Sequence, residues 1–415
     1  MSKPSERVFT WDSDKYKDSE GLKIAHERSE VALDEHTVKD DMQDYIYLNP
    51  VRKRKKHSGH SSSGHGSHHH HHHHHKKKRT KTWKKVLIAV VCVLLALVLI
   101  TTGTALLLIL KGQGELYTDD VQISAPKSLD AVVQEGGDYI VYNGQTYKYN
   151  KDVTSLLFIG VDKRDFDIPT AEGAAGQADV IVLMALDFKA NKLSMINIPR
   201  DTMTDVAIYS ASGYYTGMQK QQICLSYAYG DGRESSCANT IASVKRVFYN
   251  IPINTYYALD LDGVMAINDS VGGVDVVSPE TIEKFKQGES YHLMGKDAER
   301  FIKARVHDRP DANELRNKRH QAYTNGFFDK VVGNIKDSPT YAVDLYNESA
   351  PYSCTNLDAA KVLYMAKEVA LNGAPNKQMY SVPGESKIGA SGYAEYTVNE
   401  KEFYEQFLSV FYTKM

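Results

Sequence analysis

The segment Ile196-Asn197-Ile198-Pro199-Arg200-Asp201-Thr202 places an arginine and an aspartate directly behind a short apolar run. A run of this kind is typical of a buried strand, so Arg200 is expected at the edge of a sheet. Arginine grips phosphate oxygens through two parallel N–H bonds, and the pattern therefore indicates an anion site. The alternative is a salt bridge between Asp201 and a neighbour, and these residues alone leave both interpretations open.

Two apolar runs upstream each have an aspartate at one end. Residues 156–161 and 180–186 have the length and composition of buried strands, and Asp162 and Asp179 flank them. Both carboxylates are therefore expected at the sheet edge that carries Arg200. Carboxylate oxygens suit Mg²⁺, which usually takes one or two of them together with substrate phosphates. The three residues predict a site for Mg²⁺ and a phosphate.

The average composition hides three unlike parts. The chain has 415 residues, a formal charge of −2 and 42% hydrophobic residues, which is ordinary for a globular protein. Residues 1–85, however, are polar and contain a low-complexity tract that ends in the eight histidines His68 to His75. Such a segment cannot bury a core, and we expect a disordered cytoplasmic tail. The histidine run is interpreted as solvated, with metal binding and an affinity tag as alternatives.

Residues 86–110 carry no charge, and these 25 residues predict a transmembrane helix. As a helix they measure ~37 Å, enough to cross a ~30 Å hydrocarbon core. A cleaved signal peptide is the alternative, but the run begins after 85 residues and has no convincing cleavage site. Basic residues crowd its N-terminal flank, so the N-terminus is expected in the cytoplasm and residues 111–415 outside the membrane.

Patterns in the exported part predict a mixed central β-sheet flanked by helices, of the α/β (α+β) class. Asn143-Gly144, between alternating apolar residues, signals a hairpin. A second hairpin joins residues 180–186 to 193–198, another strand is expected at 256–261, and helical patterns lie at 237–249, 296–303 and 314–335. We divide this part into a linker (111–134), a catalytic domain (135–335) and a C-terminal part packed on the same domain (336–415).

The helix at 314–335 carries Arg316, Arg319, His320 and Tyr323 on one face, at helical spacing. Further basic residues lie just upstream: Lys303, Arg305, His307 and Arg309. This basic character indicates either a solvated face, which is the default interpretation, or the rest of the anion site. Spacing along the sequence does not distinguish the two.

The cysteines predict a disulfide. Cys224 and Cys237 flank a turn-rich stretch, and closing a loop this short would fix the entry to the following helix. Two reduced, buried thiols are the alternative. Cys354 is then left over, and zinc is not expected because the chain offers no Cys-x-x-Cys spacing.

Six ordered motifs make the chain resemble the LytR-CpsA-Psr (LCP) family. They are Phe158-Ile159-Gly160-Val161-Asp162, Ala178-Asp179, Asn197-Ile198-Pro199-Arg200-Asp201-Thr202, Tyr227-Ala228-Tyr229-Gly230, Asn268-Asp269-Ser270-Val271-Gly272-Gly273-Val274, and Arg305 with Arg316 and Arg319. The resemblance is close over residues 135–335 and loose beyond. It implies an enzyme that ligates a polyprenyl-pyrophosphate-linked glycan, of teichoic acid or capsule type, to peptidoglycan. An apolar tunnel beneath the sheet would hold the lipid.

The resemblance also assigns roles to single residues. Asp162 and Asp179 match acidic positions near Mg²⁺, and Arg200 and Arg305 match arginines that hold the pyrophosphate. The chain departs from the family at four further substrate-binding positions, where it has Gln177, Gln222, Lys303 and His320. Lys303 keeps a charge without the guanidinium fork, whereas the glutamines lose the charge. Either Arg316 and Arg319, with His307 and Arg309, compensate, or turnover is slow.

Two functions of other classes stay open. A non-catalytic regulator or scaffold would bind polyprenyl phosphates without loss of binding when Asp162 is removed. A hydrolase would release the same lipid by attack of water and would use the same residues. Nucleic-acid binding is not expected, because the dense basic stretch abuts the membrane segment, where anionic headgroups explain it.

Overall fold

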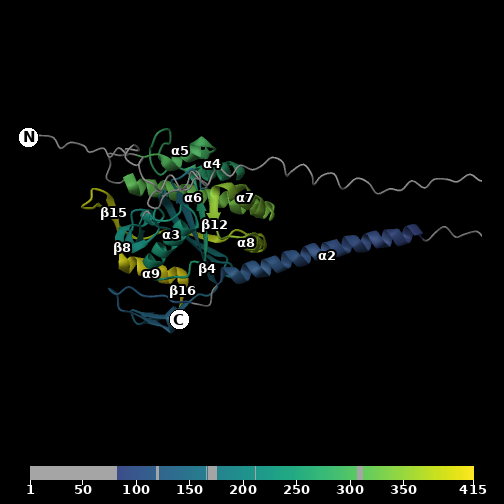
Figure 1. Ribbon diagram of the computed structural model, residues 1–415, viewed down its shortest axis with the longest axis horizontal. Coiled ribbons are helices and arrows are strands. Elements are labelled where there is room, and N and C mark those ends of the chain that lie inside the picture. The colour runs from purple at the N-terminus through teal and green to yellow at the C-terminus, as the bar shows by residue number, and fades with distance from the viewer. Residues whose placement is uncertain (1–81, 118–120, 165, 167–174, 211, 306–311) are drawn as a thin grey trace, which may run out of the picture. The chain divides into compact units, whose positions relative to one another are not determined.

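The computed structural model describes residues 82–117, 121–164, 166, 175–210, 212–305 and 312–415 (Figure 1). The predicted disordered tail up to residue 81, including the histidine run, lies outside the described residues, as do His307 and Arg309.

The first described element is α2, which spans Thr82–Leu116. Its segment Val90–Leu116 is long and apolar enough to cross a membrane. The helix runs beyond the predicted end at residue 110, so the predicted linker begins later than expected. Ion pairs explain the extension: Lys111 Nζ lies 3.5 Å from Glu115 Oε1 and 3.5 Å from Asp358 Oδ2, in the turn before α8.

A six-stranded mixed sheet lies at the centre of the part that follows α2, with the order β12-β9-β4-β5-β6-β13. β5 is antiparallel to both β4 and β6, whereas β9 is parallel to β4 and β13 is parallel to β6. The predicted mixed sheet and the predicted β5–β6 hairpin are confirmed. The strands are β12 (Ser353–Thr355), β9 (Thr255–Leu259), β4 (Val153–Val161), β5 (Ala178–Asp187), β6 (Lys192–Asn197) and β13 (Asn376–Ser381).

A second sheet has the order β1-β2-β3-β16. The predicted Asn143-Gly144 hairpin joins β2 to β3, and both residues have positive φ, 51° and 74°, as a tight hairpin turn requires. Three further hairpins complete the β-structure. The remaining strands are β1 (Ala131–Gln134), β2 (Tyr139–Tyr142), β3 (Gln145–Tyr149), β16 (Tyr412–Lys414), β7 (Met203–Tyr209), β8 (Tyr215–Gln222), β10 (Val274–Val277), β11 (Ser290–Leu293), β14 (Gly384–Ile388) and β15 (Ala394–Val398).

Helices cover the central sheet, and the three predicted from the sequence are confirmed as α3, α5 and α6. The helices are α3 (Glu234–Val247), α4 (Leu261–Ser270), α5 (Lys296–Lys303), α6 (Ala312–Asp337), α7 (Tyr341–Ser349), α8 (Ala359–Asn372) and α9 (Glu400–Phe411), with short 3₁₀ turns at Glu135–Gly137, Ile223–Ser226 and Ala350–Tyr352. The main core lies between the central sheet, α3, α9 and the second sheet, and includes Leu157, Ile159, Phe248 and Phe407.

The C-terminal part supplies strands to both sheets. β12 and β13 are the edge strands of the central sheet, and β16 pairs with β3 in the second sheet. Residues 353–414 therefore complete the same fold as residues 131–337, through strand pairing and through the side chains of α9 in the main core.

Candidate active site

The strand order brings Asp162, Asp179 and Arg200 to one edge of the central sheet. Asp162 follows the C-terminal end of β4, Asp179 lies at the N-terminal end of β5, and Arg200 follows the C-terminal end of β6. Because β5 is antiparallel to both neighbours, these three ends meet at the same edge. The sequence prediction placed these three residues together for this reason.

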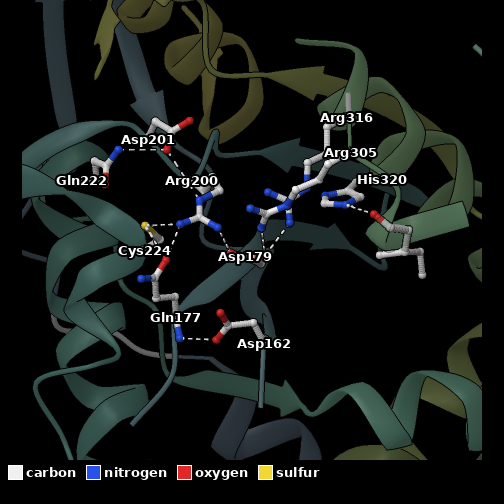
Figure 2. Close-up of polar contacts among 11 residues, drawn as sticks. Asp162, Gln177, Asp179, Arg200, Asp201, Gln222, Cys224, Arg305, Arg316 and His320 are labelled. Carbon is white, nitrogen blue, oxygen red and sulfur yellow. Dashed lines mark hydrogen bonds and ion pairs between the residues drawn. The ribbon is translucent and has the colours of Figure 1, made fainter. Parts of the chain in front are cut away.

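Asp179 is the centre of a cluster of arginines (Figure 2). Arg200 Nη1 donates to Asp179 Oδ1, and Arg316 Nη2 donates to Asp179 Oδ2. Arg305 Nη2 lies 3.6 Å from the same Oδ2. Three guanidinium groups from three separate segments thus converge on one carboxylate.

The electrostatics of the cluster favour an additional anion. Burial by itself raises the pKa of Asp179, but the ion pairs with Arg316 and Arg200 outweigh burial and lower the pKa below its ordinary value. Repulsion from Arg316, followed by burial, lowers the pKa of Arg305. Arg316 Nε is buried and has no hydrogen-bond partner among the described residues. Even with Asp201 beside Arg200, the three guanidinium groups outnumber the two carboxylates that pair with them, and phosphate oxygens would neutralise the excess charge.

Arg200 is also held from its other side. Its Nε lies 3.5 Å from Asp201 Oδ1, its Nη2 donates to Gln177 Oε1, and the same Nη2 lies 3.4 Å from Cys224 Sγ. Gln222 Nε2 donates to Asp201 Oδ1 over 3.1 Å and fixes that carboxylate in turn. These contacts fix the position of the guanidinium before a ligand arrives.

Asp162 contacts the cluster through the backbone of Gln177. The Gln177 N–H donates to Asp162 Oδ1 over 2.5 Å, and among the described residues no side chain pairs with the second carboxylate oxygen. The protein atoms that surround the carboxylate disfavour its charged form and raise the pKa of Asp162, although the residue as a whole is exposed. The hydrogen bond from the Gln177 N–H opposes this shift.

The two predicted Mg²⁺ ligands differ in their availability. Both oxygens of Asp179 accept from arginines, whereas only one oxygen of Asp162 accepts from a described residue other than itself. No group of three or more His, Cys, Asp or Glu side chains that could hold a metal occurs in the described part of the chain. The donor set fits a Mg²⁺ ion shared between Asp162 and phosphate oxygens, and it does not fit an ion held by protein ligands alone.

The structure does not bring Arg319 and Lys303 into the cluster. Arg319 is 1% exposed, pairs with the buried Glu280, and donates from Nε to Phe301 O over 3.0 Å. Lys303 Nζ lies 3.3 Å from Glu299 Oε1 at the surface. The helix face that we took as solvated by default is in fact buried, so that interpretation is wrong: Arg316 joins the anion site and Arg319 stabilises the fold.

His320 lies beside the cluster but offers it no donor. Its Nε2 is 3.1 Å from the carbonyl oxygen of Ile302, which places the ring proton on Nε2. Burial, followed by repulsion from Arg316, lowers the pKa of His320 to about 3. The neutral ring therefore presents Nδ1 as an acceptor and cannot donate to phosphate from that atom.

The predicted disulfide between Cys224 and Cys237 is wrong, because both are free thiols in the structure. Cys224 contacts Arg200, and burial raises the pKa of its thiol to about 12. Cys237 contacts Cys354 instead, and the hydrogen bond between these thiols raises the pKa of Cys237. Spacing in the sequence could not reveal this, because β12, which carries Cys354, follows α3 by more than a hundred residues.

An apolar cavity lies between the central sheet and α6, next to His320. It consists of two adjoining spaces of about 260 and 140 Å³ between the central sheet and α6, and the larger one extends to α8. The smaller space is lined by Val180, next in the chain to Asp179, and by His320. Six residues line both spaces: Phe158, Met184, Ile267, Phe327, Phe328 and Val331.

An arginine cluster next to an apolar cavity suits an amphiphile with an anionic head. Comparison with known proteins identifies the family. The LytR_cpsA_psr family profile matches residues 120–409, and the chain belongs to this family. The match begins before residue 135, where we expected the close resemblance to begin, and includes β12 and β13 in the part where we expected only a loose one.

Two curated relatives are teichoic acid transferases by name. Polyisoprenyl-teichoic acid–peptidoglycan teichoic acid transferase TagV of Bacillus subtilis (strain 168) is 28% identical over 236 residues, 54% of this chain and 55% of TagV. TagU of Bacillus cereus is 28% identical over 295 residues, 69% of this chain and 88% of TagU. The chain thus spans about half the length of TagV.

A solved structure shares the fold. Protein gbs0355 of Streptococcus agalactiae matches with a TM-score of 0.51 and 17% identity, over 62% of this chain and 86% of that protein. The predicted fold class is confirmed: a mixed α/β fold of LCP type that follows an apolar N-terminal helix.

Proposed function

We propose that this protein transfers a glycopolymer of teichoic acid or capsule type from a polyprenyl-pyrophosphate carrier to peptidoglycan. One observation carries the proposal: Arg200, Arg305 and Arg316 converge on Asp179, and the next residue in the chain, Val180, lines an apolar cavity. A polyprenyl pyrophosphate needs both, because its head is anionic and its tail is apolar. The relatives TagU and TagV are teichoic acid–peptidoglycan transferases by name, and this supports the polymer class and the acceptor.

The donor would lie across the sheet edge. Its lipid would occupy the cavity between the central sheet and α6, where apolar contacts exclude water. Its pyrophosphate would accept N–H bonds from Arg200, Arg305 and Arg316, in competition with Asp179. Arg305 is well suited to meet the ligand first, because its side chain is 51% exposed.

The reaction is a phosphoryl transfer. A hydroxyl oxygen of peptidoglycan forms a bond to the sugar-linked phosphorus and loses its proton to solvent, the bond from that phosphorus to the bridging oxygen breaks, and polyprenyl phosphate leaves with the electron pair of that bond. Catalysis of this type depends on position and charge neutralisation more than on covalent help from the protein. Arg200 and Arg316 would stabilise charge on the phosphate oxygens, and Asp201 and Gln177 would keep Arg200 in place.

Asp162 would hold Mg²⁺ together with the pyrophosphate oxygens, through the carboxylate oxygen that Gln177 does not use. A bound Mg²⁺ would supply further neutralisation of the leaving phosphate. Asp162 is exposed at the sheet edge, so the ion could enter with the substrate.

We place the reaction at the outer face of the cell membrane. α2 would be the anchor, and the basic residues before it favour a cytoplasmic N-terminus. Peptidoglycan lies on that outer side, as does the exported part of the chain in this orientation.

The test uses the full-length protein in lipid nanodiscs with a short-chain polyprenyl-pyrophosphate glycan, peptidoglycan oligomers and Mg²⁺, and follows products by mass. We compare wild type, Arg200→Ala and Arg305→Ala with Arg300→Ala, an exposed arginine outside the site. The proposal is supported if wild type and Arg300→Ala attach glycan to peptidoglycan and Arg200→Ala and Arg305→Ala do not. Free phosphorylated glycan would identify a hydrolase, and donor binding without product would identify a scaffold.

A further inference from the structure

The anion site has a second side, away from the apolar cavity. Figure 2 shows Asp201 and Gln222 on one side of Arg200, and Arg305, Arg316 and His320 on the other. The cavity adjoins the His320 side. In a phosphoryl transfer the attacking and leaving oxygens lie roughly in line, on opposite sides of phosphorus. An acceptor would therefore approach from the side of Asp201 and Gln222.

The β14–β15 hairpin is attached to this side. Gln222 Nε2, which holds Asp201, also donates to Ala394 O over 2.6 Å. Tyr396 N donates to Asp201 O over 2.8 Å, and Thr202 forms a parallel bridge with Tyr396. The C-terminal hairpin is thus bonded directly to the segment that carries Arg200.

A polar groove begins beside these contacts. It has a volume of about 660 Å³ and lies between the β7–β8 hairpin, the β14–β15 hairpin, α3 and α9. A second space of about 370 Å³ adjoins it at Thr397 and Val398 and prolongs it past β14. Neither space shares a lining residue with the apolar cavity.

The chemistry of the groove suits a charged glycan. Lys220, Arg246 and Lys387 are exposed cations on its walls, and the carboxylates Asp205 and Glu395 lie opposite two of them in the strand register. The buried ring of Phe403 contributes to the lining. Charges of both signs along an open groove match a polymer that carries carboxylates and amines, whereas an apolar lipid would leave these charges unpaired.

We propose that this groove is the acceptor subsite and that it binds a glycan strand with carboxylate-bearing peptides, as peptidoglycan has. The inference rests on the proposed function and deepens it. The donor lipid and the acceptor strand then occupy separate grooves on opposite sides of the arginine cluster, and Asp201 and Gln222 connect the acceptor groove to Arg200.

The test compares Arg246→Glu with Lys387→Glu, singly and combined, in the full-length protein in nanodiscs. Lys296→Glu, an exposed lysine of α5 outside the groove, is the matched control, and Arg246→Lys tests rescue. Two readouts are needed: the KM for muramidase-solubilised peptidoglycan oligomers, and oligomer binding measured by titration calorimetry without donor. We expect the KM and the dissociation constant of the double variant to rise at least about fivefold. Donor affinity and kcat stay unchanged.

The outcomes separate this inference from the proposed function. If wild type transfers glycan but the groove variants behave like Lys296→Glu in both readouts, the acceptor subsite is elsewhere and the proposed function stands. If wild type transfers nothing, the proposed function fails, but the binding titration still tests the acceptor subsite. Oligomer binding that is lost in the groove variants supports the subsite, and absence of oligomer binding to wild type overturns it.

Discussion

Replacing Asp179 by asparagine removes the carboxylate on which Arg200, Arg305 and Arg316 converge, and keeps the shape of the side chain. In the unliganded protein the three guanidinium groups then repel one another without a central anion. In the structure the Asp179 carboxylate neutralises part of this positive charge, and in the proposed mechanism a bound pyrophosphate also neutralises part of it. The variant should therefore be less stable than wild type and should depend more strongly on an added anion.

The magnitude follows from burial. Removing one partner of a buried ion pair costs about 3–5 kcal/mol. The Asp179 side chain is 13% exposed, so a small discount for solvent screening gives about 2–4 kcal/mol for Asp179→Asn. For a domain of this size the unfolding temperature would fall by roughly 5–10 °C. The folded-state pKa of Asp179 is lowered, so this contribution is present above the unfolded pKa near ~4 and is lost as pH falls through the folded pKa.

The assay is differential scanning calorimetry of full-length protein in nanodiscs, at pH 7 and at pH 3, with and without inorganic pyrophosphate. We expect the gap between wild type and Asp179→Asn to shrink at pH 3, and pyrophosphate to raise the unfolding temperature of the variant more than that of wild type. Equal unfolding temperatures at pH 7, or equal stabilisation by pyrophosphate, would refute the reasoning.

Three further predictions concern the surroundings of the cluster. His320 has a folded pKa of about 3, below its unfolded value of ~6.5, so the folded protein should lose stability as the pH falls from ~6.5 to about 3. In His320→Gln, the unfolding temperature measured by calorimetry should depend less on pH over that range. Arg319→Met should destabilise the fold by about 3–5 kcal/mol because it leaves Glu280 buried without its partner, and the double change with Glu280→Gln should recover part of the loss in urea unfolding. Val331→Trp should fill the cavity and raise the KM for a long-chain donor while leaving a donor of one or two isoprene units unaffected; equal effects on both would argue against a lipid in the cavity.

Much of the fold could be predicted from local signals. The Asn143-Gly144 turn and the β5–β6 hairpin follow from short-range patterns, and so do the helices whose apolar residues repeat at helical spacing. The β7–β8 hairpin was missed because β8 is a largely exposed polar strand, which lacks an apolar alternation. The parallel pairing of β13 with β6 was missed because the two strands are far apart in the sequence.

In the candidate site, too, local signals could be predicted from the sequence and contacts between distant segments could not. Asp162, Asp179 and Arg200 could be placed together because each flanks a strand that the sequence reveals. Arg316 and Arg319 could not be told apart, because three residues along a helix share a face. Partners from distant segments decide their roles: Asp179 attracts one guanidinium into the site, and Glu280 holds the other in the core. The disulfide prediction failed for the same reason, since a distant strand brings Cys354 to Cys237.

The central claim is that the arginine cluster and the apolar cavity hold the two ends of one donor. The most direct measurement is photo-crosslinking of full-length protein in nanodiscs with a polyprenyl pyrophosphate that carries a diazirine in its chain, followed by peptide mass spectrometry. We predict labels on α6 and β5, next to Phe327 and Met184, that excess inorganic pyrophosphate reduces and that Arg200→Ala and Arg305→Ala abolish. Labels confined to α2, or labels on α6 that neither variant changes, would contradict the account.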